Sequence, residues 1–236
     1  MQNDHGDPAQ VLSRPEASDA VSGIGWRYVL GQLRTHVPVP SLRQAADVAA
    51  RVVAAAGADA DNHLTLDVRP RRVVVSLQTL DVAAVTTRDS ALAQRITTAI
   101  EQEGLRTDPD VATAESRSAQ VVEIAIDALD IPAIRPFWKA ILGYVDEAGA
   151  TGPKDPLVDS LGAAPAIWFQ QMDVARPQRN RIHLDVSVPH DEAPRRVQAA
   201  LDAGGVLVSY AAAPAFWVLA DVEGNEACVT TWQGRD

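Results

Sequence analysis

The chain is poor in cysteine and in aromatic residues. Its 236 residues include one cysteine, and aromatic side chains make up 5% of the sequence. A single cysteine cannot form a disulfide within the chain, which fits the reducing environment of a cytoplasm. With so few large rings, the core of each domain must be built mainly from alanine, valine and leucine.

The sequence also lacks long apolar segments and an excess of basic residues. No stretch is long and apolar enough to cross a bilayer, and the N-terminus has neither the basic start nor the apolar centre of a signal peptide. The formal net charge is −10 at pH 7, whereas phosphate binding along a nucleic acid needs clustered Lys and Arg. One basic cluster, residues 69–72, is expected to flank a strand as solvated charge. These features predict a cytoplasmic protein with no membrane or nucleic-acid partner.

The first half of the chain has the pattern of one α+β domain at residues 13–104, after a disordered tail at residues 1–12. Helical and strand-like segments follow one another in the order α-β-β-α-β-β-α. This order predicts helices packed on an antiparallel four-stranded sheet. The segments lie at residues 13–23, 26–39, 42–56, 61–68, 72–79 and 90–103, and residues 26–39 have the pattern of one or two strands.

Several short motifs in this half match the sequence pattern of a known family. They are Gly25-Trp26, the alanine-rich helix at residues 42–56, Asn62-His63, the strand at residues 73–79 and the start of the last helix at residues 85–93. On these motifs the half resembles the pterin-4a-carbinolamine dehydratase family. The resemblance implies a sandwich of helices on a sheet and a hydro-lyase activity, the loss of water from a 4a-hydroxytetrahydropterin.

That activity needs imidazoles that exchange protons near neutral pH. The histidine pair of the family falls on Asn62 and His63, and its third histidine falls on Leu80, while Asp89 keeps the acidic position. Asparagine can bind a pterin edge but cannot shuttle a proton, and leucine can do neither. The resemblance therefore implies a degenerate catalytic pair, His63 and Asp89, with Asn62 as a ligand-binding residue. Alternatively, His63 is an ordinary, partly exposed histidine at the start of a strand.

Residues 105–120 contain few large apolar side chains and no sustained period, which is typical of a linker. A second domain follows at residues 121–233. A strand at residues 121–127 and a helix at residues 131–143 precede a strand at residues 166–172. The same pattern then restarts with residues 181–188 and 192–203, so the domain consists of two β-α-β-β-β repeats.

The last repeat ends in a predicted hairpin at residues 218–232. Gly224 and Asn225 tolerate the positive φ of a tight turn, and apolar segments flank them. After the turn, strand alternation puts Glu226 and Cys228 on one face. That face looks either into a pocket or out to water.

The repeats also carry a sequence pattern that is characteristic of a known family. It consists of Asp130, Phe137-Trp138 and Leu142-Gly143, then the segments at residues 180–186 and 219–228. On these residues the second half resembles the vicinal-oxygen-chelate superfamily, and in particular its glyoxalase-like branch. The resemblance implies paired βαβββ repeats that form a curled barrel around a small-molecule cavity.

In that superfamily a divalent metal with open positions binds neighbouring substrate oxygens. The implied ligand positions are Glu123 and His183 on the first strands, and Cys228 or Glu226 on the final strand. The last strand of the first repeat offers a glutamine, Gln170 or Gln171, which is neutral and a poor ligand. Cys228 stands where the family has a glutamate, so the set is incomplete. Each residue also has a structural interpretation: a histidine bonded within the barrel, a small buried cysteine, or a glutamate paired with an arginine. Trp168 and Trp217 are expected to line the cavity or to belong to the core.

The sequence is compatible with three functions. The chain is a glyoxalase- or dioxygenase-like enzyme, with or without one divalent metal, or an active dehydratase of the lyase class, or a non-catalytic binding and oligomerisation protein. In each case the expected partners are a small pterin-like or vicinal-oxygen ligand and further copies of the chain in a homo-oligomer.

Overall fold

A computed structural model of the chain describes residues 9–111, 117–118, 121–150, 152–175 and 182–234. The chain divides into two compact units, Met1–Val121 and Val122–Asp236. Residues 1–8 of the expected tail lie outside the described residues. The rest of that tail is bound to the first unit, because the Thr87 amide donates to the Gln10 carbonyl at 2.9 Å and the Leu12 amide donates to the Val85 carbonyl at 2.9 Å.

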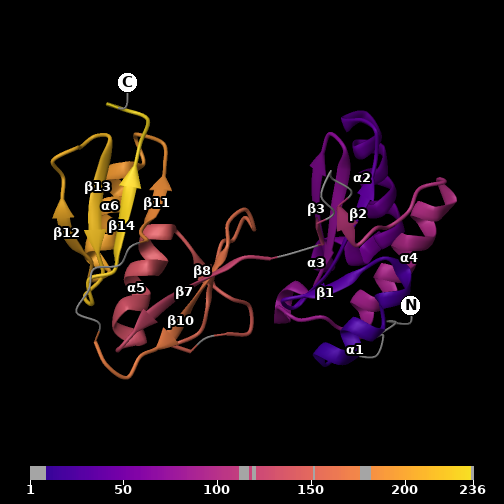
Figure 1. Ribbon diagram of the computed structural model, residues 1–236, viewed down its shortest axis with the longest axis horizontal. Helices are drawn as coiled ribbons and strands as arrows, with labels where there is room; N and C mark the ends of the chain where they lie inside the picture. Colours follow the sequence, from indigo (N-terminus) through magenta and orange to yellow (C-terminus); the bar gives the residue numbers. More distant parts are fainter. Residues whose placement is uncertain (1–8, 112–116, 119–120, 151, 176–181, 235–236) are drawn as a thin grey trace, which may run out of the picture. The chain divides into compact units, whose positions relative to one another are not determined.

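The first unit confirms the α+β fold with one antiparallel sheet in the order β1-β2-β4-β3 (Figure 1). The strands are β1 (Arg27–Val29), β2 (Gln32–Pro38), β3 (Leu64–Arg69) and β4 (Arg72–Leu77). The α-helices are α1 (Arg14–Asp19), α2 (Leu42–Ala56), α3 (Ala60–His63) and α4 (Thr87–Gln102). Three 3-10 turns join them: η1 (Ser22–Ile24), η2 (Gly57–Asp59) and η3 (Leu80–Val82). The strand expected from residue 61 begins only at Leu64, because the preceding residues form α3.

One face of this sheet packs against the helices. Strand alternation turns Leu33 and Val37 of β2 into the core, where they are fully buried with side chains of α2 and α4. Trp26 is also fully buried, and its indole Nε1 donates to Thr97 Oγ1 at 2.8 Å. The other face of β2 carries Arg34 and His36.

The segment expected to be a linker at residues 105–120 begins as part of the first unit. Thr107 Oγ1 donates to the Ile24 carbonyl at 2.8 Å. The amides of His36 and Asp108 each donate to the other's carbonyl, at 2.9 and 2.8 Å. Two short strands, β5 (Asp110–Val111) and β6 (Arg117–Ser118), pair with each other, and the remainder of the segment lies outside the described residues.

The second unit confirms the pair of repeats. Each repeat forms a sheet in which its first strand pairs in parallel with its last, in the orders β7-β10-β9-β8 and β11-β14-β13-β12 (Figure 1). The first sheet contains β7 (Glu123–Ala128), β8 (Val145–Asp146), β9 (Leu157–Val158) and β10 (Ala166–Gln171). The second contains β11 (Leu184–Ser187), β12 (Val206–Ser209), β13 (Phe216–Ala220) and β14 (Glu226–Thr230). The barrel is not closed, because strand pairing among the described residues stays within each repeat.

Helices α5 (Ile131–Leu142) and α6 (Ala193–Asp202) supply the core of this unit together with one face of each sheet. Phe137 and Trp138 are buried on α5 and meet edge to face, with ring centroids 5.4 Å apart. The predicted hairpin is present as β13 and β14, and Gly224 in its turn has a φ of 87°. Among the described residues, no helix combines the length and apolar character needed to span a bilayer.

Candidate functional site

The second sheet of the second unit has one face on the core and one face away from it. Leu184 of β11 and Ala227 and Val229 of β14 belong to the core. Alternation therefore places Asp185 and Cys228 on the opposite face. The parallel register makes these two residues direct neighbours.

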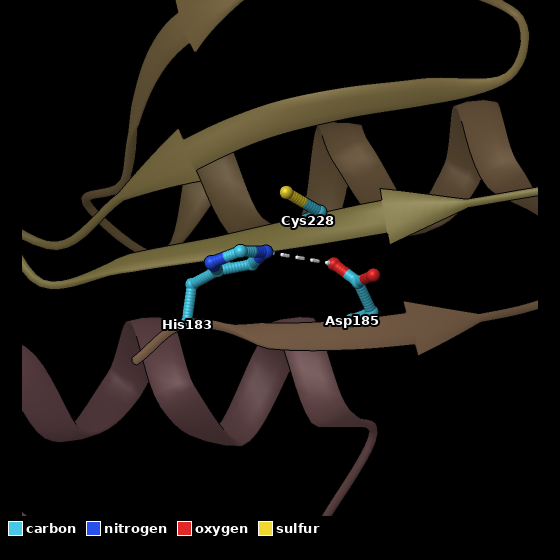
Figure 2. A group of neighbouring side chains, drawn as sticks. All are labelled: His183, Asp185 and Cys228. Atoms are coloured by element: carbon cyan, nitrogen blue, oxygen red, sulfur yellow. Dashed lines mark ion pairs between the residues drawn. The ribbon is translucent and has the colours of Figure 1, made fainter. Parts of the chain in front are cut away.

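His183 joins them just before β11, so three different ligand-bearing side chains meet on this face (Figure 2). One ligand atom from each of His183, Asp185 and Cys228 lies within 4.8 Å of the other two. His183 Nε2 is 3.4 Å from Asp185 Oδ1, and the two side chains are 53% and 55% exposed. Cys228 is only 6% exposed. A buried sulfur thus lies next to an exposed polar pair that solvent and ligands can reach.

The next residues along the same face add hydroxyl groups and apolar surface. Ser187 Oγ and Thr230 Oγ1 are 2.8 Å apart, one step along the strands from the cluster. On β13, Val218 lies opposite Cys228 and Phe216 lies opposite Thr230. Phe216 is 37% exposed. The cluster therefore has polar and apolar neighbours of the kind that line small-molecule sites.

The donor set of the cluster suits a divalent metal of the zinc class. Zn²⁺ binds histidine nitrogen, cysteine sulfur and carboxylate oxygen, and three protein ligands leave a fourth position for water or substrate. Ligands at tetrahedral Zn²⁺ lie about 3.3–3.8 Å apart, as follows from metal–ligand distances of about 2.0–2.3 Å. The separations in this cluster need only small side-chain movements to reach that geometry.

The cluster contains two of the predicted ligands and one residue that the sequence did not single out. His183 and Cys228 are brought together, whereas Glu123 and Glu226 are not in the group among the described residues. Asp185 completes it instead. Its signal in the sequence is the spacing His-x-Asp, because residues two apart on a strand share a face.

Glu123 begins β7 in the other sheet and is exposed. Burial, followed by the charges of Glu123 and Asp155, raises the pKa of Glu147. Glu226 is half-buried and lies opposite Ala220 at the start of β14.

The two predicted tryptophans lie on different faces of their sheets. Trp217 packs against the core of the second unit. Trp168 is half-buried on β10, between the buried residues Ile167 and Phe169. Alternation turns Trp168 away from the core face. Of the two tryptophans, Trp168 is therefore the one placed to contact a bound small molecule.

In the first unit, His63 and Asp89 are in direct contact. His63 Nδ1 lies 2.8 Å from Asp89 Oδ1, and the two side chains are 4% and 0% exposed. Thr79 Oγ1 lies 3.2 Å from His63 Nδ1 and donates to Asp89 Oδ2 at 2.8 Å. Asp89 also accepts the Thr86 amide at 2.7 Å, which caps the start of α4. The pair therefore belongs to a buried network that holds a helix end.

The other two positions of the degenerate set, Asn62 and Leu80, each adjoin a residue of this network in the sequence and carry no imidazole. Asn62 Nδ2 donates to Asp81 Oδ2 at 2.9 Å. Leu80 begins η3 and is 40% exposed.

Comparison with known families agrees with this two-unit organisation. Residues 10–99 match the model of the pterin 4 alpha carbinolamine dehydratase family, and residues 123–230 match the model of the glyoxalase-like domain. The chain is thus a two-domain protein of dehydratase-like and glyoxalase-like parts. It carries an N-terminal pterin-4a-carbinolamine dehydratase-like domain and a C-terminal glyoxalase-like domain. No curated protein matches the chain.

Solved structures similar to parts of the chain include members of both groups. A glyoxalase/bleomycin resistance protein/dioxygenase family enzyme from Burkholderia phytofirmans PsJN is 19% identical, with a TM-score of 0.39, over 48% of this chain and 98% of its own. A transcriptional coactivator/pterin dehydratase from Brucella melitensis is 22% identical, with a TM-score of 0.34, over 38% of this chain and 98% of its own. The fosfomycin resistance protein FosX from Listeria monocytogenes is 10% identical, with a TM-score of 0.38, over 51% of this chain and 96% of its own.

Proposed function

We propose that the glyoxalase-like domain binds a small oxygen-bearing molecule through a divalent metal held by His183, Asp185 and Cys228. The observation that carries the proposal is the convergence of one nitrogen, one oxygen and one sulfur ligand atom within 4.8 Å on one sheet face. Such a metal would act as a Lewis acid on neighbouring oxygens of the substrate.

The exposure of the histidine–aspartate pair supports a binding role. An ion pair between two half-exposed side chains contributes only about 0–1 kcal/mol to stability. The contribution of this pair to stability is therefore too small to explain why it lies beside the thiol of Cys228. The half-exposed pair leaves the cluster reachable, while the hydroxyl pair of Ser187 and Thr230 can orient a polar substrate beside it.

Metal analysis of the freshly purified full chain tests the proposal. We expect near-stoichiometric divalent metal in the parent protein and its loss in His183→Ala, Asp185→Asn and Cys228→Ser. His190→Ala is the matched control, because His190 is an exposed histidine of the same domain that contacts Trp232 instead. In cobalt-loaded protein, a sulfur-to-cobalt charge-transfer band should be present in the parent and absent in Cys228→Ser. Equal metal content in the parent and His183→Ala would contradict the proposal.

We further infer that the dehydratase-like domain has weak or no dehydratase activity. His63 is buried and held by Asp89 and Thr79 in a network that also caps α4. Asn62 and Leu80 supply no imidazole. The full chain should therefore not accelerate water loss from a 4a-hydroxytetrahydropterin. Turnover by the parent protein that persists in His190→Ala would contradict this inference and show that the domain is an active lyase. Assembly of the chain into a homo-oligomer stays a prediction, which sedimentation velocity tests.

A further inference from the structure

The sheet of the first unit has a second face, opposite its helices, that carries a group of basic side chains. On β2, Leu33, Thr35 and Val37 are buried on the helix side, so alternation places Arg34 and His36 on the other side. The cross-strand register adds to this face. It pairs His36 with Val74 on β4, and Arg72 lies two residues before Val74 on the same face.

Two pairs of arginines lie directly opposite each other here. Arg27 of β1 faces Arg34 of β2, and Arg69 of β3 faces Arg72 of β4. Like charges in cross-strand pairs destabilise a sheet. Arg69 is neutralised by Asp67, with Nε 2.8 Å from Oδ1. Within the part of the chain that the structure describes, Arg27, Arg34 and Arg72 form no ion pair with a carboxylate. In a chain with a net charge of −10, this local surplus of positive charge needs a reason.

His36 lies between Arg34 and Arg72 and is 8% exposed. Its Nδ1 atom is buried and has no hydrogen-bond partner among the described residues. A buried polar atom without a partner is costly, and in native proteins it commonly marks the place of a water or an ion.

The groups that face His36 come from several strands. Arg34 shares β2, Arg72 and Val74 come from β4, Asp67 lies beyond Val74 on β3, and Asp108 pairs with the His36 backbone. Burial, followed by the charges of Arg72 and Arg34, lowers the pKa of His36, while the Asp108 backbone and carboxylate oppose this. Asp108 is itself engaged by Arg106, with Nη2 3.1 Å from Oδ2.

We propose that Arg34, His36 and Arg72 form a binding site for a small oxyanion of the phosphate class. Guanidinium groups match the oxygens of phosphate with paired, charge-assisted hydrogen bonds. A bound oxyanion provides an acceptor for an N–H at His36 Nδ1 and relieves the repulsion between the arginines. Nucleic acid does not fit, because the carboxylates of Asp67 and Asp108 flank the site and the whole chain is acidic. This site is separate from the His183 cluster and does not depend on the function proposed above.

Phosphate titration of the full chain, followed by NMR of the histidine ring nitrogens, tests the site. Ionic strength is held constant by replacing sodium chloride with sodium phosphate, and the His36 signals are identified by their loss in His36→Asn. We expect saturable shifts of the His36 nitrogens. We also expect the pH midpoint of His36 to rise when phosphate is bound, because the anion favours the protonated ring.

Three substitutions distinguish a site from general ion effects. Arg34→Gln and Arg72→Gln should each weaken phosphate binding about tenfold, the effect of losing one charge-assisted contact. Arg71→Gln should bind like the parent, because Arg71 carries the same charge in the exposed β3–β4 turn. Arg34→Lys keeps the charge but not the paired N–H donors of the guanidinium, so it should lose less phosphate affinity than Arg34→Gln. It also covers the case in which Arg34→Gln does not fold. Shifts that do not saturate, or that Arg71→Gln weakens as much as Arg72→Gln does, would overturn the proposal.

Discussion

The carboxylate of Asp221 is predicted to hold the end of the second unit together. It is 2% exposed and follows β13 directly. One of its oxygens accepts Trp138 Nε1 at 3.0 Å and Asn225 Nδ2 at 2.8 Å. The other accepts the amides of Glu223 and Asn225, both at 2.9 Å. The same residue therefore shapes the β13–β14 turn and anchors it to α5.

Replacing Asp221 with Asn leaves two of these four donors facing an amide NH₂ instead of an oxygen. The indole of Trp138 is 2% exposed, so water cannot replace the lost acceptor there. Leaving a buried donor unsatisfied costs about 1–3 kcal/mol, and the second donor adds to this, so we expect a total of about 3 kcal/mol. For a unit of this size, that loss corresponds to a Tm lower by roughly 10 °C.

Differential scanning calorimetry of the full chain is the assay, since the transition of the first unit serves as an internal reference. A double-mutant cycle then isolates the contact. In Trp138→Phe, which has no indole donor, Asp221→Asn should cost about 1–2 kcal/mol less than in the parent, because directly contacting residues couple by such amounts. Additive effects of the two substitutions, or an unchanged transition in Asp221→Asn, would refute the assigned role of this carboxylate.

Two further predictions concern the second unit and can be measured in the same calorimeter. Gly205→Ala should destabilise the second unit by about 1–3 kcal/mol through overpacking, because a Cβ there would lie 2.4 Å from Cδ2 of the Phe137 ring. An unchanged Tm would contradict the close packing at this position. Burial and the charges of Glu123 and Asp155 raise the pKa of Glu147. The folded state therefore binds the proton of the Glu147 carboxyl more tightly than the unfolded state does. Above the raised pKa the ionised carboxylate opposes folding. Glu147→Gln should therefore raise the Tm at pH 7, with a gain that shrinks as the pH falls toward 4, and equal Tm values at pH 7 would count against this.

Much of the fold follows from local sequence patterns. The repeats of the second unit were predictable because their strands and helices recur in one order, and the turn at Gly224 was predictable because glycine accepts its φ of 87°. The expected start of β3 differs from the observed one because the residues before Leu64 form α3. Residues of α3 include Asp61, Asn62 and His63, and the last of these is drawn into the buried contact with Asp89. This contact is with a residue 26 positions away, so the local pattern around residues 61–63 does not reveal it.

The candidate site was predictable only in part, because it depends on register between distant strands. His183 and Cys228 could be named from a family pattern, but the neighbour of Cys228 is set by the parallel pairing of β11 with β14. That pairing places Asp185 beside the thiol, whereas Glu226 lies at the start of the strand, opposite Ala220. The contact between Trp138 and Asp221 spans 83 positions and has no local signal either.

Among the described residues, the pairs His63–Asp89 and His183–Asp185 show how burial separates a structural pair from a candidate binding pair. His63 and Asp89 are 4% and 0% exposed, and Thr79 and Thr86 saturate the carboxylate while it caps a helix. His183 and Asp185 have the same chemistry at 53% and 55% exposure, where an ion pair adds little to stability. Removing the buried pair should therefore unfold its unit, whereas removing the exposed pair should leave the second unit folded. The exposed pair is thus the one whose substitution can report on ligand binding alone, which makes the glyoxalase-like domain the place to look for chemistry.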